Sequence, residues 1–323
     1  MRHSDLVTLK GGAQVSRLGL GTAQLGGLFS SVTERDSEEL IDFAVGERIS
    51  YFDTAPHYGK GVSEKRLGKY LSKHSSVPWT ISTKVGRLLV PAANSLDAEF
   101  ADADSSVERF LDYSGKGIRQ SFEESLERLG VDSVDIVYIH DPDDYPDQAI
   151  AEAYPELEKM RSEGLIKSIG LGMNFTEIPA RFVRETDIDV VMISNRYTLL
   201  DHSADAELLP EALKKGVSVV AVGVFNSGVL ANPVPGSHFF YGPASDEILS
   251  KAQHLQNVLA DFKVSLPQAA LQYPLRHPTV KSVVVGCRSK ESLKENIANF
   301  NAPISDEAWD ALTEAMNIHQ RFS

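Results

Sequence analysis

The sequence predicts a closed barrel of eight parallel strands that alternate with helices, the (β/α)8 or TIM barrel. Short apolar runs rich in β-branched residues alternate with longer amphipathic runs, and eight of the short runs can be counted. A chain of 323 residues also suits one such barrel. Closure removes unpaired strand edges, which makes a barrel simpler than an open sheet of eight strands. We therefore expect a single barrel domain over residues 1–323.

The elements can be placed in order along the chain. A short N-terminal hairpin is expected in "VTLKGGAQVSR", turning at Gly11 and Gly12. The expected barrel strands are 18–22, 51–55, 80–86, 134–140, 168–173, 190–194, 217–225 and 282–287. Amphipathic patterns predict helices at 33–47, 117–130, 149–164, 204–216 and 289–300, and another begins within "VSEKRLG" at 62–68. Long βα loops are expected at 87–106 and 226–245, where barrels usually build the mouth of an active site.

Composition narrows the class of partner. A net charge of -13 and a pI near 5.2 disfavour nucleic acid or an anionic membrane surface. The sequence has no apolar run of membrane-spanning length, and its first residues lack the apolar core of a signal peptide. Cys287 is the only cysteine, so no internal disulfide can form. We expect a cytoplasmic protein that acts on a small molecule, and the sequence predicts no particular oligomeric state.

Polar residues end three neighbouring strands of the expected barrel. Asp53 ends the second strand, Lys84 the third and His140 the fourth, while Tyr58 follows the second strand by five residues. Catalytic groups of barrel enzymes lie at the C-terminal ends of strands, so these four side chains should meet at one mouth.

The four residues make chemical sense as a catalytic set. A tyrosine hydroxyl has a pKa of about 10, and we expect the ammonium of Lys84 to lower it. Asp53 would keep the buried lysine charged, and His140 would donate a hydrogen bond to a substrate oxygen. Each residue alone also has a structural interpretation, such as a capping aspartate or a hydrogen-bonded core histidine. The presence of all four at neighbouring strand ends favours a catalytic role. Glu64, in the first turn of the helix that follows, is instead expected to stabilise the helix N-terminus by its negative charge.

Four segments resemble the aldo-keto reductase family, and the resemblance covers nearly the whole chain. They are "FDTAPHYGKGVSEKRLG" (52–68), "STKVG" (82–86), "SFEESLERLGVDSVDIVYIHDPD" (121–143) and "VVVGCRSKESLKEN" (283–296). The resemblance implies a (β/α)8 barrel that moves a hydride between a nicotinamide cofactor and a carbonyl or alcohol. It also implies that Asp53, Tyr58, Lys84 and His140 form the catalytic tetrad, with Tyr58 transferring the proton.

The same resemblance implies a set of cofactor contacts. Thr22, Ala23 and Asp53 should lie beside the nicotinamide, with Asn174 at its carboxamide. The remaining expected contacts are Ser194, Gly223, Phe225, Asn226, Gly228, Gly286, Arg288, Lys290, Ser292 and Asn296.

Some positions depart from the family pattern. Met173 precedes Asn174 where the family has serine, Ser194 stands in the place of a glutamine, and Val222 takes the place of a stacking aromatic that Phe225 could replace. Ser292 occupies the position where NADP-preferring relatives carry an arginine for the 2′-phosphate. We therefore favour NAD, and NADP stays open because Arg288 and Lys290 are near.

The stretches "FNSGVL", "HFFYGPAS" and "SNRYTLLD" resemble the branch of the family that oxidises free aldoses, such as L-fucose, D-arabinose or L-galactose, at C1 to aldonolactones. Pyridoxal oxidation and general aldehyde or ketone reduction are alternatives, as is a cofactor-binding regulatory subunit with little turnover. The expected pocket residues are His57, Trp79, His140, Phe225, His238, Phe239 and Tyr241, because aromatic groups beside polar ones suit a sugar.

The sequence does not support three other kinds of functional site. "GLGTAQLG" at 19–26 has Gln24 where a Rossmann fingerprint needs glycine, and no helix opens directly behind it. The acidic run at 141–147 lacks the spacing of a calcium loop, and we expect no metal. A carboxylate-based glycoside hydrolase would have no use for the pair of Tyr58 and Lys84.

Overall fold

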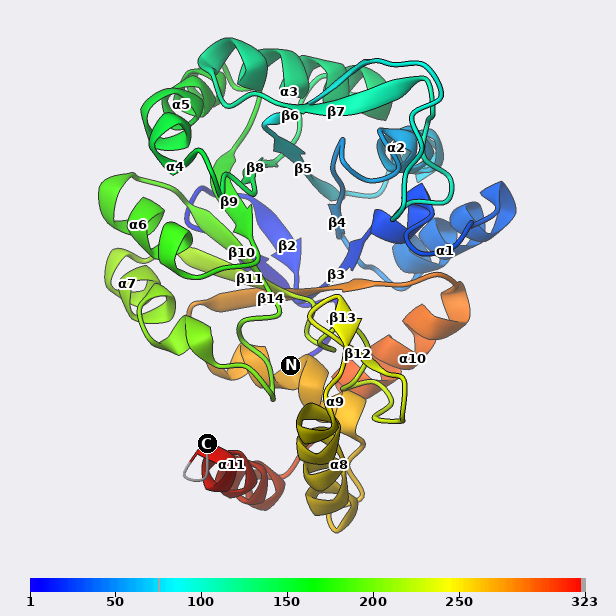
Figure 1. Cartoon of the computed structure of the whole chain (residues 1–323), viewed down its shortest axis with the longest axis vertical. Coiled ribbons are helices and arrows are strands. Elements are labelled where there is room, and N and C mark those ends of the chain that lie inside the picture. The colour runs from blue at the N-terminus through cyan, green and yellow to red at the C-terminus, as the bar shows by residue number, and fades with distance from the viewer. Residues whose placement is uncertain (75, 321–323) are drawn as a thin grey trace.

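A computed structural model describes residues 1–74 and 76–320. Its centre is a closed barrel of eight parallel strands in the order β10, β11, β14, β3, β4, β5, β8 and β9 (Figure 1). Their bounds are β3 (Leu18–Gly21), β4 (Tyr51–Asp53), β5 (Thr80–Val85), β8 (Ile136–His140), β9 (Ser168–Met173), β10 (Val190–Ser194), β11 (Ser218–Val222) and β14 (Val280–Gly286). The pairing of β14 with β3 joins the last strand to the first. The predicted (β/α)8 barrel is confirmed.

Helices surround the strands in Figure 1. The main ones are α1 (Glu34–Gly46), α2 (Val62–Leu71), α3 (Gly115–Leu129), α5 (Tyr154–Ser162), α6 (Glu177–Glu185), α7 (Leu208–Lys215), α8 (Asp246–Ala260), α9 (Leu266–Gln272), α10 (Lys290–Asn301) and α11 (Asp306–Gln320). Shorter helical turns are α4 (Pro146–Gln148) and η1 to η5, at Ala23–Gly26, Ser72–His74, Ala149–Ala153, Ser203–Asp205 and Tyr273–Arg276. The helix expected over 204–216 is therefore split into η4 and α7.

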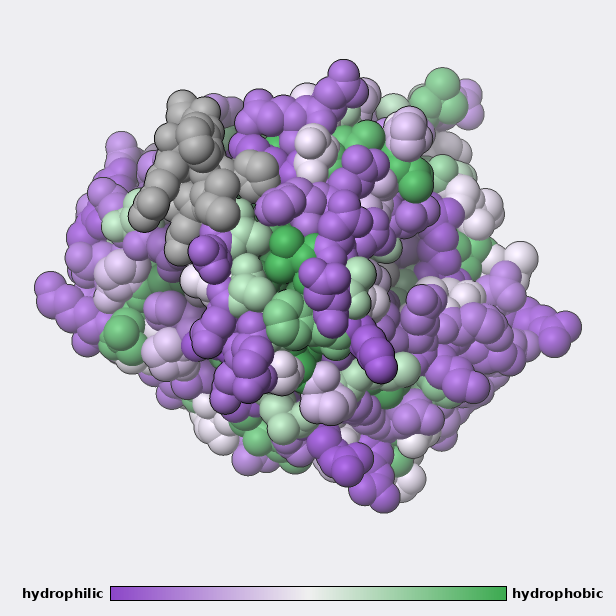
Figure 2. Space-filling view, turned by 90° about the horizontal axis from the view of Figure 1, so that it is seen from below, coloured by the Kyte–Doolittle hydropathy of each residue, from purple (hydrophilic) through white to green (hydrophobic). Residues whose placement is uncertain are grey.

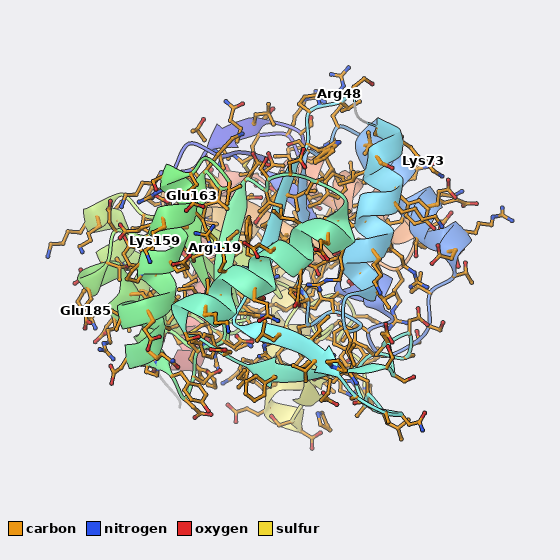
Figure 3. All side chains as sticks on the ribbon, turned by 90° about the horizontal axis from the view of Figure 1, so that it is seen from above. Arg48, Lys73, Arg119, Lys159, Glu163 and Glu185 are labelled. Atoms are coloured by element: carbon orange, nitrogen blue, oxygen red, sulfur yellow. The ribbon has the colours of Figure 1, made fainter. Side chains whose placement is uncertain are left out.

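Local chemistry fixes where several helices begin and end. The hydroxyls of Thr33, Ser114 and Ser289 accept hydrogen bonds from the first turns of α1, α3 and α10. Gly130 ends α3 in the left-handed conformation, with a φ of 67°. Between helices, Arg119 on α3 donates to Glu163 at the end of α5 at 2.6 Å, and Figure 3 shows both side chains at this contact.

The barrel interior is packed with side chains and closed at one end by the N-terminal hairpin. The hairpin pairs β1 (Leu6–Thr8) with β2 (Gln14–Ser16), as expected from its glycine turn. One buried cluster joins the hairpin to the strands and consists of Leu9, Ala13, Val15, Tyr51, Ile136, Tyr138, Val190, Met192, Val220 and Val284. A site built from groups at the ends of the strands therefore has to open at the other end of the barrel.

Two βα connections contain strands of their own. The segment expected as a loop over 87–106 begins with β6 (Arg87–Pro91), which pairs with β7 (Val107–Leu111) in an antiparallel hairpin. The segment 226–245 contains the short pair β12 (His238–Phe239) and β13 (Gly242–Pro243). The strand expected over 217–225 ends at Val222, because residues 223–228 turn away from the barrel.

The outer surface is mostly hydrophilic on the face formed by α8 and α11, which pack on each other (Figure 2). In the described part of the chain, no helix is long and apolar enough to cross a membrane.

Gly68 allows α2 and α3 to pack closely. A Cβ added there would collide with the backbone of Leu129, which cannot move without shifting α3. We expect Gly68→Ala to lower the free energy of unfolding by about 1–3 kcal/mol, as overpacking does. Gly46→Ala is the matched control, because among the described residues nothing lies within 4 Å of its added Cβ. Chemical denaturation measures both, and equal stability of the two variants would contradict this account.

Candidate active site

The four residues singled out at strand ends lie together at the open end of the barrel. Asp53 ends β4, Lys84 lies in β5 and His140 ends β8, and all three are at least 93% buried. Tyr58 comes from the turn after β4, which is tight because Gly59 has a φ of 62°. A Cβ on Gly59 would lie 2.6 Å from the Gly26 oxygen, so only glycine allows this approach of two backbones.

Lys84 is the centre of the hydrogen-bond network. Its ammonium donates to Asp53 Oδ2 at 2.7 Å, to the Thr54 carbonyl at 2.9 Å and to the Tyr58 hydroxyl at 3.0 Å. These three bonds use all three protons of the ammonium. Since the Tyr58 oxygen accepts from Lys84, its own O–H is available to donate to a group in the cavity. Ser82 fixes Asp53 from the other side by donating to Oδ1 at 2.6 Å.

Burial shapes the proton affinities of this network. Burial raises the pKa of Tyr58 to about 12, and the charge of Lys84 opposes this rise without reversing it. The expected effect of Lys84 is therefore present, but the pKa of Tyr58 still lies above its ordinary value because burial outweighs it. Burial alone would lower the pKa of Lys84, but Asp53 and Tyr58 outweigh that effect and raise it. Lys84 thus remains an ammonium that can stabilise a phenolate.

The surroundings of His140 favour its neutral imidazole. Burial lowers its pKa well below the usual range, and the charges of Arg87 and Lys84 add to this effect. Nε2 lies 3.4 Å from Asp141 Oδ2, and Nδ1 is buried without a hydrogen-bond partner among the described residues. The neighbouring carboxyl favours the tautomer with its proton on Nε2. His140 can therefore donate from Nε2 to a substrate oxygen.

A cavity of about 460 Å³ opens above the tetrad. Its lining includes Tyr58, Lys84 and His140 together with Ala23, Leu28, Phe29, His57, Arg87, Glu99, Phe100, Asp141, Gly172, Met173, Asn174, Met192, Ser194, Val222 and Tyr241. The lining residues that were not singled out in the sequence are Leu28, Phe29, Arg87, Glu99, Phe100, Asp141, Gly172 and Met192. Arg87 directly follows the "STKVG" segment and Asp141 follows His140, so their places beside strand ends could have indicated them.

The β6–β7 hairpin positions one wall of the cavity. Phe100 stacks on Tyr58 with ring centres 6.1 Å apart. Arg109 of β7 donates to the His57 carbonyl at 2.8 Å, and the buried Lys60 donates to Ser95 Oγ at 2.7 Å. These bonds tie the hairpin loop to the turn that carries Tyr58.

The expected nicotinamide contacts separate into two groups. Ala23, Asn174 and Ser194 line the cavity, and Tyr241 donates to Asn174 Oδ1 at 3.2 Å. By contrast, the Thr22 hydroxyl is buried and donates to the Asp53 carbonyl at 2.9 Å.

Two residues after β11 are also turned inward. Asn226 is fully buried and bonded to Thr198 and to the Asn195 carbonyl. Phe225 packs against the hydrophobic core and does not reach the cavity, where Val222 lies instead. The structure thus places Thr22, Asn226 and Phe225 in supporting positions. Gly223 and Gly228, both at positive φ, shape the same turn.

The segment after β14 carries the other expected cofactor residues. Arg288 donates to the Leu28 carbonyl at 2.6 Å and to Ser30, and Lys290 forms an ion pair with Glu39 at 2.7 Å. Both cations are thus already partnered. Ser292 completes a capping box with Ser289 at the start of α10. Asn296 Nδ2 donates to the sulfur of Cys287 at 3.3 Å.

Besides Phe225, three expected substrate-pocket residues lie elsewhere. Trp79 precedes β5 and lines a different cavity, at the hairpin end of the barrel, with Gln14, Ser50 and Lys167. Its assignment to the substrate pocket was wrong, because residues before a strand lie at the end opposite the mouth. His238 and Phe239 are in β12 and do not line the cavity above the tetrad. His57 and Tyr241 do line it.

The residues fit a nicotinamide cofactor. Asn174 and Ser194 offer amide and hydroxyl groups beside Tyr58 and Lys84, as a carboxamide requires. At the end of β14, Gly286 lies against Gln24, and a Cβ there would collide with the Gln24 side chain. Gln24 Oε1 is buried without a hydrogen-bond partner within the described ranges. An exposed glycine and an unpaired amide oxygen beside it suit close approach of a ligand.

Comparisons with known proteins find a family profile and relatives that match most of the chain. The profile of the Aldo/keto reductase family matches residues 17–317. D-threo-aldose 1-dehydrogenase from Pseudomonas sp is 38% identical, covering 98% of this chain and 99% of that protein. Pyridoxal 4-dehydrogenase from Microbacterium luteolum is 37% identical, covering 93% and 94%. Among solved structures, an aldo-keto reductase from Bacillus halodurans in its holo form gives a TM-score of 0.78 at 25% identity, covering 97% and 96%.

Proposed function

We propose that this protein, which belongs to the aldo/keto reductase family, is an NAD-dependent dehydrogenase that oxidises a free aldose at C1 to its aldonolactone. Membership makes it an oxidoreductase acting on CH–OH or C=O groups. The observation that carries the proposal is the network in which Lys84 joins Asp53 to the Tyr58 hydroxyl at the floor of a polar cavity. The aldose dehydrogenase at 38% identity supports the choice of substrate.

Each side chain of the site has its own role in the proposed oxidation. A bound nicotinamide supplies the acceptor for the hydride that leaves C1. Tyr58 takes the proton of the C1 hydroxyl, and Lys84 stabilises the phenolate from which that transfer begins. His140 donates from Nε2 to the same substrate oxygen and holds it against Tyr58. Phe100 stacks on the Tyr58 ring and forms part of the cavity wall beside it.

Pyridoxal oxidation is a second candidate. It is favoured by the relative at 37% identity and by the aromatic side chains of Phe29, Phe100 and Tyr241 in the cavity wall. Pyridoxal is a flat ring that such a wall could accept by stacking.

One assay distinguishes these functions. Formation or consumption of the reduced cofactor is followed by absorbance with NAD or NADP against L-fucose, D-arabinose, L-galactose, pyridoxal and simple aldehydes. We expect the highest kcat/KM with an aldose and NAD. A preference for pyridoxal would replace the proposal with the second candidate. Tight cofactor binding without turnover of any substrate would favour a regulatory subunit.

Cofactor preference gives a further prediction. Arg288 and Lys290 are already bonded to groups of this chain, and Ser292 offers no charge for a 2′-phosphate. Ser292→Arg would add a planar donor for that group. We expect the ratio of kcat/KM for NADP over NAD to rise by about 10-fold, the worth of one charge-assisted bond. Lys294→Arg, which keeps the charge on the same helix, is the control. An unchanged ratio in Ser292→Arg would mean that the 2′-position lies elsewhere.

A further inference from the structure

Asp141 has a left-handed backbone conformation at the edge of the cavity. Its φ is 44°, in the left-handed region that side chains other than glycine, asparagine and aspartate rarely adopt. The Tyr113 hydroxyl lies 2.6 Å from the His140 carbonyl and 2.7 Å from the Asp141 carbonyl, which holds this turn in place. The Asp141 N–H donates to the Gly172 carbonyl at 3.0 Å. These contacts fix the backbone at Asp141 in a conformation that aspartate tolerates.

This turn brings the Asp141 carboxyl into the wall of the cavity that His140 and Tyr58 also line. Oδ2 lies 2.9 Å from Arg87 Nη2 and 3.4 Å from His140 Nε2, and the side chain is 17% exposed. Arg87 Nε and His140 Nδ1 are both buried without a hydrogen-bond partner in the described part of the chain. The carboxyl is therefore surrounded by donors on one side and open to the cavity on the other.

A carboxylate beside His140 can accept a hydrogen bond from a hydroxyl next to the reacting carbon. If His140 Nε2 donates to the substrate oxygen at C1, Asp141 Oδ2 lies within reach of the oxygen on a neighbouring atom. An ionised carboxylate only accepts hydrogen bonds, so that oxygen must carry a proton. In a cyclic aldose the ring oxygen has no proton, whereas the C2 hydroxyl has one.

We propose that Asp141 accepts a hydrogen bond from the C2 hydroxyl and restricts the substrates to 2-hydroxyaldehydes and aldoses with a free C2 hydroxyl. This inference rests on the proposed oxidation at C1 and deepens it. The chemistry also separates aldoses from pyridoxal, which carries no hydroxyl on the atom next to its aldehyde carbon.

The experiment compares substrates that differ only in this hydroxyl. In the oxidative direction, kcat/KM is measured for an aldose and its 2-deoxy analogue. In the reductive direction, it is measured for lactaldehyde and propanal. We expect the wild type to prefer the hydroxylated member of each pair by about 10- to 100-fold, as a hydrogen bond to a charged group implies. Asp141→Asn should bring both ratios to within about threefold.

Three variants separate the loss of the Asp141 carboxylate from misfolding and from a nonspecific loss of activity. Asparagine tolerates the left-handed conformation, so Asp141→Asn should fold, and its Tm checks this. Arg87→Gln removes the ion pair but leaves the carboxylate, so the preference should persist. Asp144→Asn removes a charge from the same loop at an exposed position and should leave both ratios unchanged.

The outcomes separate this inference from the proposed function. Oxidation of the aldose and of its 2-deoxy analogue at equal rates would overturn the role of Asp141 while leaving the dehydrogenase proposal intact. A preference for lactaldehyde over propanal that depends on Asp141, without oxidation of any aldose, would support the inference and reject the aldose. If the preference for the hydroxylated substrate falls equally in Arg87→Gln and Asp141→Asn, Asp141 acts only by holding Arg87 and does not bind the C2 hydroxyl. No turnover of any substrate would overturn both proposals.

Discussion

Tyr58→Phe should lower kcat/KM for aldose oxidation by about 10²- to 10⁴-fold, the range that a positioned proton-transfer group contributes. The phenol oxygen accepts from Lys84 at 3.0 Å and is the group we expect to exchange the proton with the substrate. Phenylalanine keeps the ring that stacks on Phe100, so the cavity wall should persist. Cofactor affinity, measured by fluorescence titration, should therefore change little.

Tyr145→Phe is the matched control, because Tyr145 is 44% exposed, packs on Tyr113 and does not line the cavity. This substitution also removes a phenol hydroxyl, but one outside the site, so the variant should keep the wild-type rates. Full activity of Tyr58→Phe would reject Tyr58 as the proton-transfer residue, and a parallel loss of cofactor binding would instead point to a distorted pocket.

Lys84→Met should remove activity and also destabilise the fold. The ammonium is the partner of Asp53 at 2.7 Å, and both side chains are at most 5% exposed. Removing one member of a buried ion pair lowers the free energy of unfolding by about 3–5 kcal/mol, because the other charge is left uncompensated. Activity should fall at least as far as in Tyr58→Phe, since burial would raise the pKa of Tyr58 further without the opposing charge.

The double variant Asp53→Asn with Lys84→Met separates the two effects. The amide oxygen that replaces the carboxylate at position 53 can still accept from Ser82, and no charge remains unpaired. We expect chemical denaturation to show recovery of most of the lost stability, while turnover stays at the level of Lys84→Met. Recovery of turnover together with stability would mean that Lys84 acts through folding alone.

The fold was predictable because barrel strands have a simple signature. Runs such as Ile136–His140 are buried at every position and are apolar up to the residue that ends the strand. Strand order then placed Asp53, Lys84 and His140 at one end, and the structure brings them together with Tyr58. Their catalytic roles stay predictions until the variants are measured. The same reasoning, applied to strand direction, would have excluded Trp79, which precedes β5 rather than following it.

What the sequence did not reveal depends on contacts between distant segments. The β6–β7 hairpin was expected as a loop, and its place above Tyr58 depends on bonds such as Arg109 to the His57 carbonyl, across 52 residues. The wall residues Glu99 and Phe100 lie on the loop of this hairpin, so no local pattern indicates them. Burial of Tyr58 is another tertiary effect, and it outweighs the expected effect of Lys84 on the Tyr58 pKa.

Oxidation at C1 is tested most directly with an aldose that carries deuterium at that carbon. The aldose that performs best in the substrate panel is incubated with NAD, and the products are examined by NMR. We expect deuterium in the reduced nicotinamide, the aldonolactone as the sugar product, and slower turnover than with the unlabelled sugar. Reduced cofactor without deuterium, or cofactor that binds without being reduced, would contradict the proposed function.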